Sequence, residues 1–332
     1  MSTKASSTIW FYALGYFLAY VPYSALTKAV SSGRAGGTPL SGLAMLPTAV
    51  SSSLLAMLVF LTAMGWWRFA GRRRMGGFDL PCPDLRTTIS GLATATVVIT
   101  TTLAYTFEGI SIVLAMVLMR GGVLVLAPIT DALTRRPVRV ESWVALALSF
   151  TALLVTFSEK GGAVLSLPAV LDISAYLAAY FVRLRLMSGS AKSTDVACNR
   201  KFFVEEQMVA TPAALLVLVL VALAGPANLS APLISGFTDV WTWPLLAVLI
   251  GVGICSQGTG VFGGLILLEP RENSYCVPVN RASSVLAGVL ASSIVAVAFD
   301  IAAPSAHEMA GAGLILLAVL ALGFGPRLAG RG

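Results

Sequence analysis

Long runs of apolar residues, separated by short polar or basic connections, extend along almost the whole chain. A helix needs about 20 apolar residues to cross the hydrocarbon core of a bilayer. By that measure the pattern predicts ten membrane-spanning helices, with no soluble domain between them. Their approximate limits are Ile9–Lys28, Leu43–Arg68, Leu85–Phe107, Gly109–Leu133, Val140–Phe157, Leu167–Met187, Phe202–Ala224, Trp243–Leu268, Ser274–Phe299 and Glu308–Phe324. We therefore predict an all-α integral membrane protein.

The amino-acid composition is typical of a protein whose surface is mostly in contact with lipid. Hydrophobic residues make up 57% of the chain and charged residues only 11%, with a mean hydropathy of +0.87. The four cysteines show no paired spacing and the only histidine is His307, so we expect no metal site and no cofactor. The first apolar run lacks a small-residue cleavage site after it, and we interpret it as a retained helix.

The basic residues gather on one side of the predicted bundle. With a cytoplasmic N-terminus, seventeen of the 22 Lys and Arg residues fall on the cytoplasmic side and three on the opposite side. The last two, Arg120 and Arg281, fall within the membrane. The net charge of +7 therefore reflects topology, and we expect no nucleic-acid partner. Both termini are predicted in the cytoplasm, and a bacterial inner (plasma) membrane is the expected location.

A pair of rare residues recurs in the two halves of the chain. Glu108 precedes Arg120 by twelve residues, and Glu269 precedes Arg281 by twelve, at an offset of 161 residues. Tyr16 and Tyr20 are related to Tyr176 and Tyr180 by an offset of 160. Five helices per half make the halves, residues 1–160 and 161–332, an inverted repeat within one transmembrane bundle. The alternative is a chance alignment of apolar sequence.

The chain resembles the ten-helix transporters of the drug/metabolite transporter superfamily, of the EamA and nucleotide-sugar transporter type. The best local matches are MVLMRGGVLVLAPITDALTRRPVRVESWVALALSF, from Met116, and VPVNRASSVLAGVLASSI, from Val277. The resemblance implies that the fourth and ninth spans face a central cavity, with the first and sixth contributing walls. It also implies that Arg120 and Arg281 hold an anionic substrate, as cations do in related phosphate and nucleotide-sugar carriers.

The residues themselves leave two interpretations of the buried arginines open. A guanidinium group offers a fork of donors that suits carboxylate or phosphate, so Arg120 and Arg281 are candidate substrate contacts. Alternatively, each pairs with a carboxylate or with backbone carbonyls and fixes helix packing. The other candidate substrate contacts carry hydroxyl or amide groups on the first, sixth, eighth and ninth predicted spans: Tyr16, Tyr20, Tyr176, Tyr180, Gln257 and Asn280. An interfacial aromatic belt is the competing explanation for the tyrosines, and Tyr105, nearer a helix end, is predicted to be interfacial.

Three carboxylates at membrane depth are candidates for coupling transport to protons: Asp172, Glu205 and Glu206. Desolvation can bring a carboxylate towards neutral-pH titration, as proton coupling requires. Interfacial exposure, or pairing with the neighbouring Arg200 and Lys201, is the alternative. Glu108 and Glu269 are predicted at helix boundaries.

The sequence therefore predicts a secondary-active carrier that moves a small organic metabolite by alternating access, with the anionic class of substrate favoured by the arginines. Protons or a counter-substrate are the expected coupling partners. The alternatives are a multidrug or amino-acid exporter of EamA type, a channel or scramblase, and a membrane-embedded enzyme. The chain lacks a paired-aspartate motif and a Ser/His/Asp set, so we expect no catalytic residues.

Overall fold

The computed structural model describes residues 2–35, 38–75, 78–105, 107, 112–133, 143–144, 147–148, 151–152, 154–155, 166–193, 195–239, 245–270, 273–300 and 303–328. Its long helices are α1 (Ser2–Ser31), α2 (Gly42–Ala63), α3 (Leu85–Ala104), α4 (Ile112–Leu133), α6 (Leu167–Ser190), α7 (Val196–Ala224), α9 (Leu246–Leu268), α10 (Asn273–Phe299) and α11 (Ala306–Leu328). A shorter helix, α8 (Ala227–Thr238), lies between α7 and α9.

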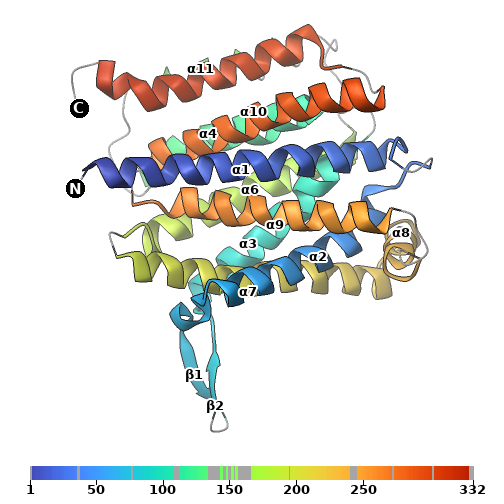
Figure 1. Cartoon of the computed structure of the whole chain (residues 1–332), viewed down its shortest axis with the longest axis horizontal. Helices are drawn as coiled ribbons and strands as arrows, with labels where there is room; N and C mark the ends of the chain where they lie inside the picture. Colours follow the sequence, from blue (N-terminus) through green and yellow to red (C-terminus); the bar gives the residue numbers. More distant parts are fainter. Residues whose placement is uncertain are drawn as a thin grey trace.

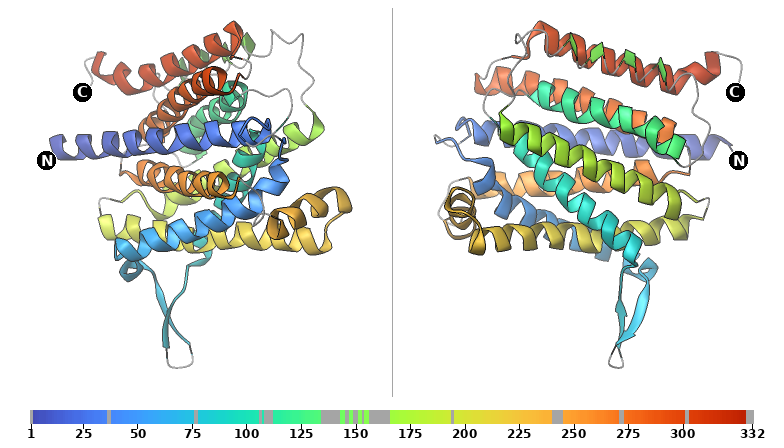
Figure 2. Two further views of the ribbon diagram at one scale, coloured as in Figure 1. Left: turned by 45° about the vertical axis from the view of Figure 1, so that its right-hand side comes forward. Right: turned by 180° about the vertical axis from the view of Figure 1, so that it is seen from behind.

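Seven of the helices in the described part of the chain are long and apolar enough to cross a membrane: α1, α2, α3, α6, α7, α9 and α10. The chain is therefore a helical integral membrane protein. The long helices lie side by side, and α1 begins at the same end of the bundle at which α11 ends (Figures 1 and 2). Helices α4 and α11 coincide with the fourth and tenth predicted spans. Most of the fifth, Val140–Phe157, lies outside the described residues.

Eight helices form a closed ring, in which each contacts the next. The order around the ring is α1, α9, α2, α7, α3, α6, α4 and α10, and α10 returns to α1. Outside the ring, α11 packs on α4 and α10, and α8 packs on α2 and α7. Neighbours in the ring are mostly distant in sequence, so the ring brings residues from both halves of the chain to one centre.

The connection between the second and third spans contains the two strands found in the described part of this otherwise helical structure. There the chain forms a 3₁₀ turn, η1 (Trp66–Phe69), and a hairpin of β1 (Arg72–Met75) and β2 (Phe78–Pro81). The strands pair antiparallel, with Arg72 opposite Pro81, and the hairpin stands out from the bundle beyond α2 and α7 (Figure 1). A two-residue Gly-Gly connection between short segments is a hairpin signal in the sequence that the long apolar runs obscured.

Glu205 on α7 holds the base of this hairpin and the start of α3. One carboxylate oxygen accepts from the Gly71 backbone N–H at 2.9 Å, and the other accepts from the Asp84 N–H at 3.1 Å and the Thr87 hydroxyl at 2.8 Å. The first backbone N–H groups of a helix have no partner within the helix, so a carboxylate placed there stabilises its beginning. The hairpin therefore leaves and returns to the bundle at a fixed point.

Candidate functional site

Arg120 and Arg281 come together at the centre of the ring. Arg120 lies on α4 and Arg281 on α10, two helices that pack against each other, and their side chains are 3% and 0% exposed. Both helices reach these positions through apolar turns, so each guanidinium group is carried into the interior by its own helix. Charge at this depth is costly and demands polar partners.

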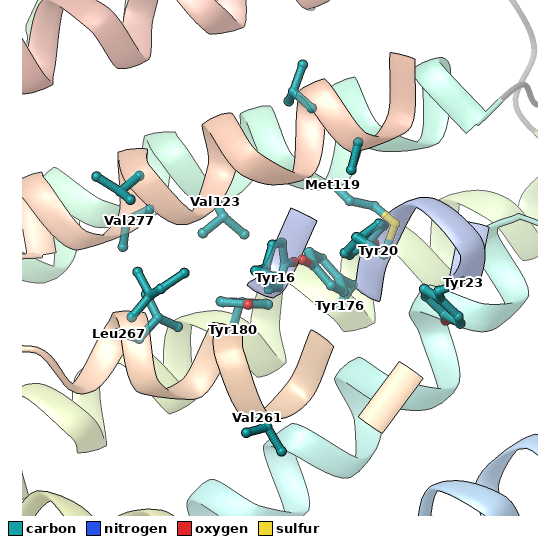
Figure 3. Close-up of a cluster of buried hydrophobic side chains, with 14 of the residues drawn as sticks. Tyr16, Tyr20, Tyr23, Met119, Val123, Tyr176, Tyr180, Val261, Leu267 and Val277 are labelled. Carbon is teal, nitrogen blue, oxygen red and sulfur yellow. The ribbon is translucent and has the colours of Figure 1, made fainter. Parts of the chain in front are cut away.

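Tyrosine hydroxyls supply those partners. Arg120 donates one hydrogen bond to the hydroxyl of Tyr20, on α1, and another to that of Tyr176, on α6. Arg281 donates to the hydroxyls of Tyr176, at 3.2 Å, and Tyr180, at 2.7 Å. Figure 3 shows the tyrosines of α1 and α6 gathered in one cluster. The two arginines are thus linked through a shared acceptor, Tyr176.

Aromatic faces add to the stabilisation of the cations. The guanidinium carbon of Arg120 lies 5.2 Å from the ring centroid of Tyr20 and 5.3 Å from that of Tyr176, and that of Arg281 lies 4.8 Å from the Tyr180 ring. Such contacts contribute about 2 kcal/mol or more where the groups are desolvated. They stabilise a cation without neutralising it.

No carboxylate pairs with either arginine among the described residues. The Nε atom of each also lacks a hydrogen-bond partner there. Beside Arg281, the fully buried Asn280 has neither its amide oxygen nor its amide nitrogen bonded to a described residue. Unsatisfied buried polar groups cost free energy and mark places where a further partner fits.

A third arginine at the centre is paired. Arg183 on α6 donates from Nε and Nη2 to the two carboxylate oxygens of Glu206 on α7, at 2.9 and 2.7 Å. Glu206 also accepts from the hydroxyls of Ser90, at 2.5 Å, and Thr94, at 3.2 Å, on α3. This bidentate pair joins α3, α6 and α7 and leaves Glu206 fully buried and satisfied.

A cavity of about 60 Å³ lies between α1, α3, α4, α6 and α9. Its walls combine hydroxyl-bearing side chains, glycines and two of the arginines: Tyr16, Tyr20, Tyr23, Thr94, Val97, Val98, Thr101, Arg120, Tyr180, Arg183, Ser256, Thr259, Gly260, Gly263 and Gly264. Ligand pockets for small organic molecules usually measure about 300–1,000 Å³. The cavity has room for only a few water molecules in this conformation and would have to widen to admit an organic solute.

The structure brings most of the predicted substrate contacts together. Asn280 lies against α9, where its amide nitrogen is 3.3 Å from the position a Cβ would take at Gly263. Gln257 is an exception, because it donates to the side chain of Gln207 on α7, at 3.1 Å, and does not line the cavity. Glu108 lies outside the described residues, and Glu269 caps the end of α9.

The three predicted ion-coupling carboxylates occupy different settings. Glu205 is held by backbone amides and Glu206 by Arg183, as described above. Asp172 is 7% exposed, and its Oδ2 atom has no hydrogen-bond partner among the described residues. It lies four residues before Tyr176, on the same stripe of α6. Of the three, Asp172 alone has a carboxylate oxygen that is not already hydrogen-bonded.

Two sequence-based placements are wrong. Arg183 was counted among the seventeen basic residues of the cytoplasmic side, but it is 4% exposed, pairs with Glu206 and lines the cavity. Tyr105 was predicted to be interfacial, but it is 1% exposed and its hydroxyl lies 2.5 Å from that of Tyr20. A signal for Arg183 was present, since it continues the stripe of α6 that carries Tyr176 and Tyr180.

Comparison with known proteins identifies the fold only. No protein-family model and no curated protein matches the sequence. A solved structure described only as "Crystal structure of protein" is similar, with a TM-score of 0.54 and 17% sequence identity, over 93% of this chain and 94% of that one. At this level of identity the similarity shows a related fold and gives no information about the function of this chain.

Proposed function

We propose that this chain is a secondary-active transporter that carries a small organic anion across the membrane by alternating access. One observation carries the proposal: Arg120 and Arg281 are buried at the centre of the helix ring, and neither is paired with a carboxylate among the described residues. A purely structural arginine pair would be expected to have its charge matched by acids or by several backbone carbonyls.

The charges around the cavity favour an anion. The guanidinium groups of Arg120 and Arg183 line it, and that of Arg281 lies next to it through its hydrogen bond to Tyr180. The described residues supply one carboxylate partner, Glu206, which Arg183 occupies. Tyrosine hydroxyls accept hydrogen bonds but bring no formal charge. In a medium of low dielectric constant the excess positive charge attracts carboxylate or phosphate, which guanidinium forks bind with paired hydrogen bonds. The unbonded amide of Asn280 adds a donor and an acceptor for the rest of the solute.

The same proposal includes ten spans arranged as two inverted repeats, residues 1–160 and 161–332, as in the drug/metabolite transporter superfamily. Its support is the ring order. Exchanging α1 with α6, α2 with α7, α3 with α9 and α4 with α10 maps every contact of the ring onto a contact of the ring, and the contacts of α2 with α7 and of α4 with α10 map onto themselves. The contact of α1 with α9 becomes that of α6 with α3, for example. This is the behaviour expected of a pseudo-two-fold axis in the membrane plane.

The proposal also covers the orientation of the protein in the membrane and the driving force for transport. The end of the bundle at which α1 begins is taken as cytoplasmic, from the distribution of Lys and Arg, in a bacterial inner membrane. Protons or a counter-substrate supply the driving force. Of the coupling candidates we favour Asp172, whose Oδ2 atom is not hydrogen-bonded to a described residue. Loss of pH-driven accumulation with intact exchange in Asp172→Asn would assign coupling to protons.

Transport by the purified protein in liposomes tests the proposal. A thermal-shift screen first compares carboxylates, phosphate esters and nucleotide sugars with amino acids and cationic drugs, and the hits are then assayed for saturable uptake and counterflow. Arg120→Gln and Arg281→Gln are each expected to lower counterflow of the anion at least about a hundredfold, since each removes a charge-assisted contact of about 3 kcal/mol. Arg34→Gln, at an exposed arginine, serves as the control.

Each alternative has its own outcome in this assay. Hits confined to cationic compounds would favour a multidrug exporter and refute the anion site. Conductance that does not saturate would indicate a channel, and chemical conversion of the solute would indicate an enzyme. Full transport in both arginine variants, folded and monodisperse, would show that the arginines serve packing.

A further inference from the structure

The arginine–tyrosine contacts of the two halves are nearly equivalent. Tyr16 and Tyr20 on α1 have ring centroids 5.2 Å apart at an interplanar angle of 43°, and Tyr176 and Tyr180 on α6 have theirs 5.0 Å apart at 47°. In each half the second tyrosine accepts from the arginine of that half, Tyr20 from Arg120 and Tyr180 from Arg281. The offset of 160 residues between the tyrosine pairs therefore has a geometric counterpart.

The first tyrosine of each pair breaks this equivalence. Tyr176 accepts hydrogen bonds from Arg120 and from Arg281. Its counterpart Tyr16 makes no hydrogen bond with any described residue, although it lies within electrostatic range of both guanidinium groups. Tyr16 instead lines the cavity, with its ring against α9, where a Cβ at Gly263 would be 2.9 Å from it. Two equivalent side chains thus hold two different positions at one site.

We propose that Tyr16 and Tyr176 exchange these positions during transport. This inference rests on the proposed function, because in an inverted-repeat carrier the opposite-facing conformation arises when the two repeats exchange conformations. In the conformation described here Tyr176 bridges the arginines and Tyr16 is released. In the opposite one Tyr16 bridges Arg120 and Arg281, and Tyr176 lines the cavity. Each arginine keeps the tyrosine of its own half, Tyr20 or Tyr180, throughout.

If the exchange occurs, Tyr16 and Tyr176 have opposite effects on the equilibrium between the described and the opposite conformation. Tyr176→Phe removes an acceptor that both arginines use in the described conformation, so it destabilises that conformation. Tyr16→Phe removes an acceptor used only in the opposite conformation, so it stabilises the described one by comparison. If the two tyrosines served only packing or substrate contact, their Phe variants would not shift the conformational equilibrium of the substrate-free protein in opposite directions.

Cys276 provides a reporter for the equilibrium. It is fully buried near the start of α10, on the face that carries Asn280. At that end of the bundle a buried polar cluster joins α4, α6 and α10: Asn273 donates to Ser188, at 2.7 Å, and to Asp131, at 3.1 Å, and Lys192 donates to Asn273, at 2.9 Å. Opening this end to the solvent exposes the Cys276 thiol. Its labelling rate then follows the population of the opposite conformation.

The experiment labels Cys276 with a maleimide in purified, substrate-free protein whose other cysteines, Cys82, Cys198 and Cys255, are replaced by serine. Tyr176→Phe is expected to raise the labelling rate roughly tenfold, and Tyr16→Phe to lower it by a similar factor, given the strength of hydrogen bonds to charged groups. The double variant returns towards the starting rate. Tyr12→Phe is the matched control, because Tyr12 lies one turn before Tyr16 on α1 but does not line the cavity. Thermal unfolding confirms that each variant is folded.

Labelling rates that move in the same direction in Tyr16→Phe and Tyr176→Phe, or that match the Tyr12→Phe control, would overturn the exchange. Counterflow measured on the same preparations separates this inference from the proposed function. Opposite shifts in labelling without any saturable transport would keep the exchange and refute the carrier. Anion counterflow with parallel shifts would keep the carrier and refute the exchange.

Discussion

Neutralising Glu206 should destabilise the protein by several kcal/mol, because it leaves a buried cation without its partner. The side chains of Arg183 and Glu206 are 5% and 0% exposed and meet through two hydrogen bonds of 2.7 and 2.9 Å. Glu206→Gln keeps the shape of the side chain but removes its charge and turns one acceptor into a donor that faces other donors. Removing one partner of a buried ion pair costs about 3–5 kcal/mol. We expect a loss of that size in the free energy of unfolding.

Equilibrium unfolding in mixed micelles measures this loss, and a double variant identifies its cause. Arg183→Met combined with Glu206→Leu removes both charges at similar volume, and apolar replacement of a whole buried pair is often neutral or stabilising. The double variant should therefore recover at least half of the loss. Asp84→Asn is the control, because it breaks an ion pair with Lys201 whose side chains are 68% and 43% exposed. Exposed pairs contribute about 0–1 kcal/mol.

A Glu206→Gln variant that unfolds with the wild-type free energy would refute this reasoning. It would mean that Glu206 carries a proton in the folded protein and that Arg183 is stabilised by other groups. Glu206 would then return as a proton-coupling candidate, to be tested by pH-driven accumulation in liposomes. A double variant as unstable as Glu206→Gln would instead assign the loss to packing around Ser90 and Thr94.

Two further predictions concern the surroundings of the site. Glu205→Ala should lower the free energy of unfolding by about 1–3 kcal/mol, because backbone N–H groups at Gly71 and Asp84 lose their acceptor, and hydrogen exchange at those two amides should quicken first. Unchanged exchange there would refute the capping role. Gly253→Ala should destabilise by about 1–3 kcal/mol, because its Cβ would overlap the Ala49 carbonyl oxygen and lie 2.6 Å from Ser52, whereas the control Gly251→Ala meets only Leu26 at 3.9 Å. Equal unfolding free energies in the two glycine variants would contradict the close packing of α2 on α9.

The spans and the arginines could be predicted from sequence because each depends on local information. A run of about 20 apolar residues is enough to identify a helix that crosses a bilayer. Arg120 and Arg281 were identifiable as site candidates because a charge within such a run is rare. The tyrosines followed from their helical spacing and from the offset between the halves.

The partners of these residues could not be predicted, because they depend on which helices become neighbours. Helices α6 and α7 are consecutive in the chain, but both pack on α3. Arg183 and Glu206 meet because of this shared neighbour. Arg183 lies near the end of the sixth predicted span, Leu167–Met187, and was therefore counted with the basic residues of the cytoplasmic side. Tyr105 lies at the end of α3 but is covered by α1, through its contact with Tyr20.

Six of the eight ring helices, all except α4 and α10, form two groups of three. The two groups differ in the main contacts that hold their helices together. Helices α3, α6 and α7 share the buried network of Arg183, Glu206, Ser90 and Thr94. Helices α9, α1 and α2, their counterparts under the proposed exchange of repeats, share close backbone contacts at glycine, including a hydrogen bond of 2.7 Å from the Ser53 hydroxyl to the Gly253 carbonyl.

Small residues allow helices to approach closely without polar side chains between them. The first group is thus joined by a bidentate ion pair between α6 and α7, and the second by a close glycine contact between α2 and α9. Both groups line the cavity, the first with Tyr180 and Arg183 and the second with Tyr16 and Gly263. Widening the cavity for a solute therefore requires the groups to separate there, and the contacts that would change are those between arginines and tyrosines.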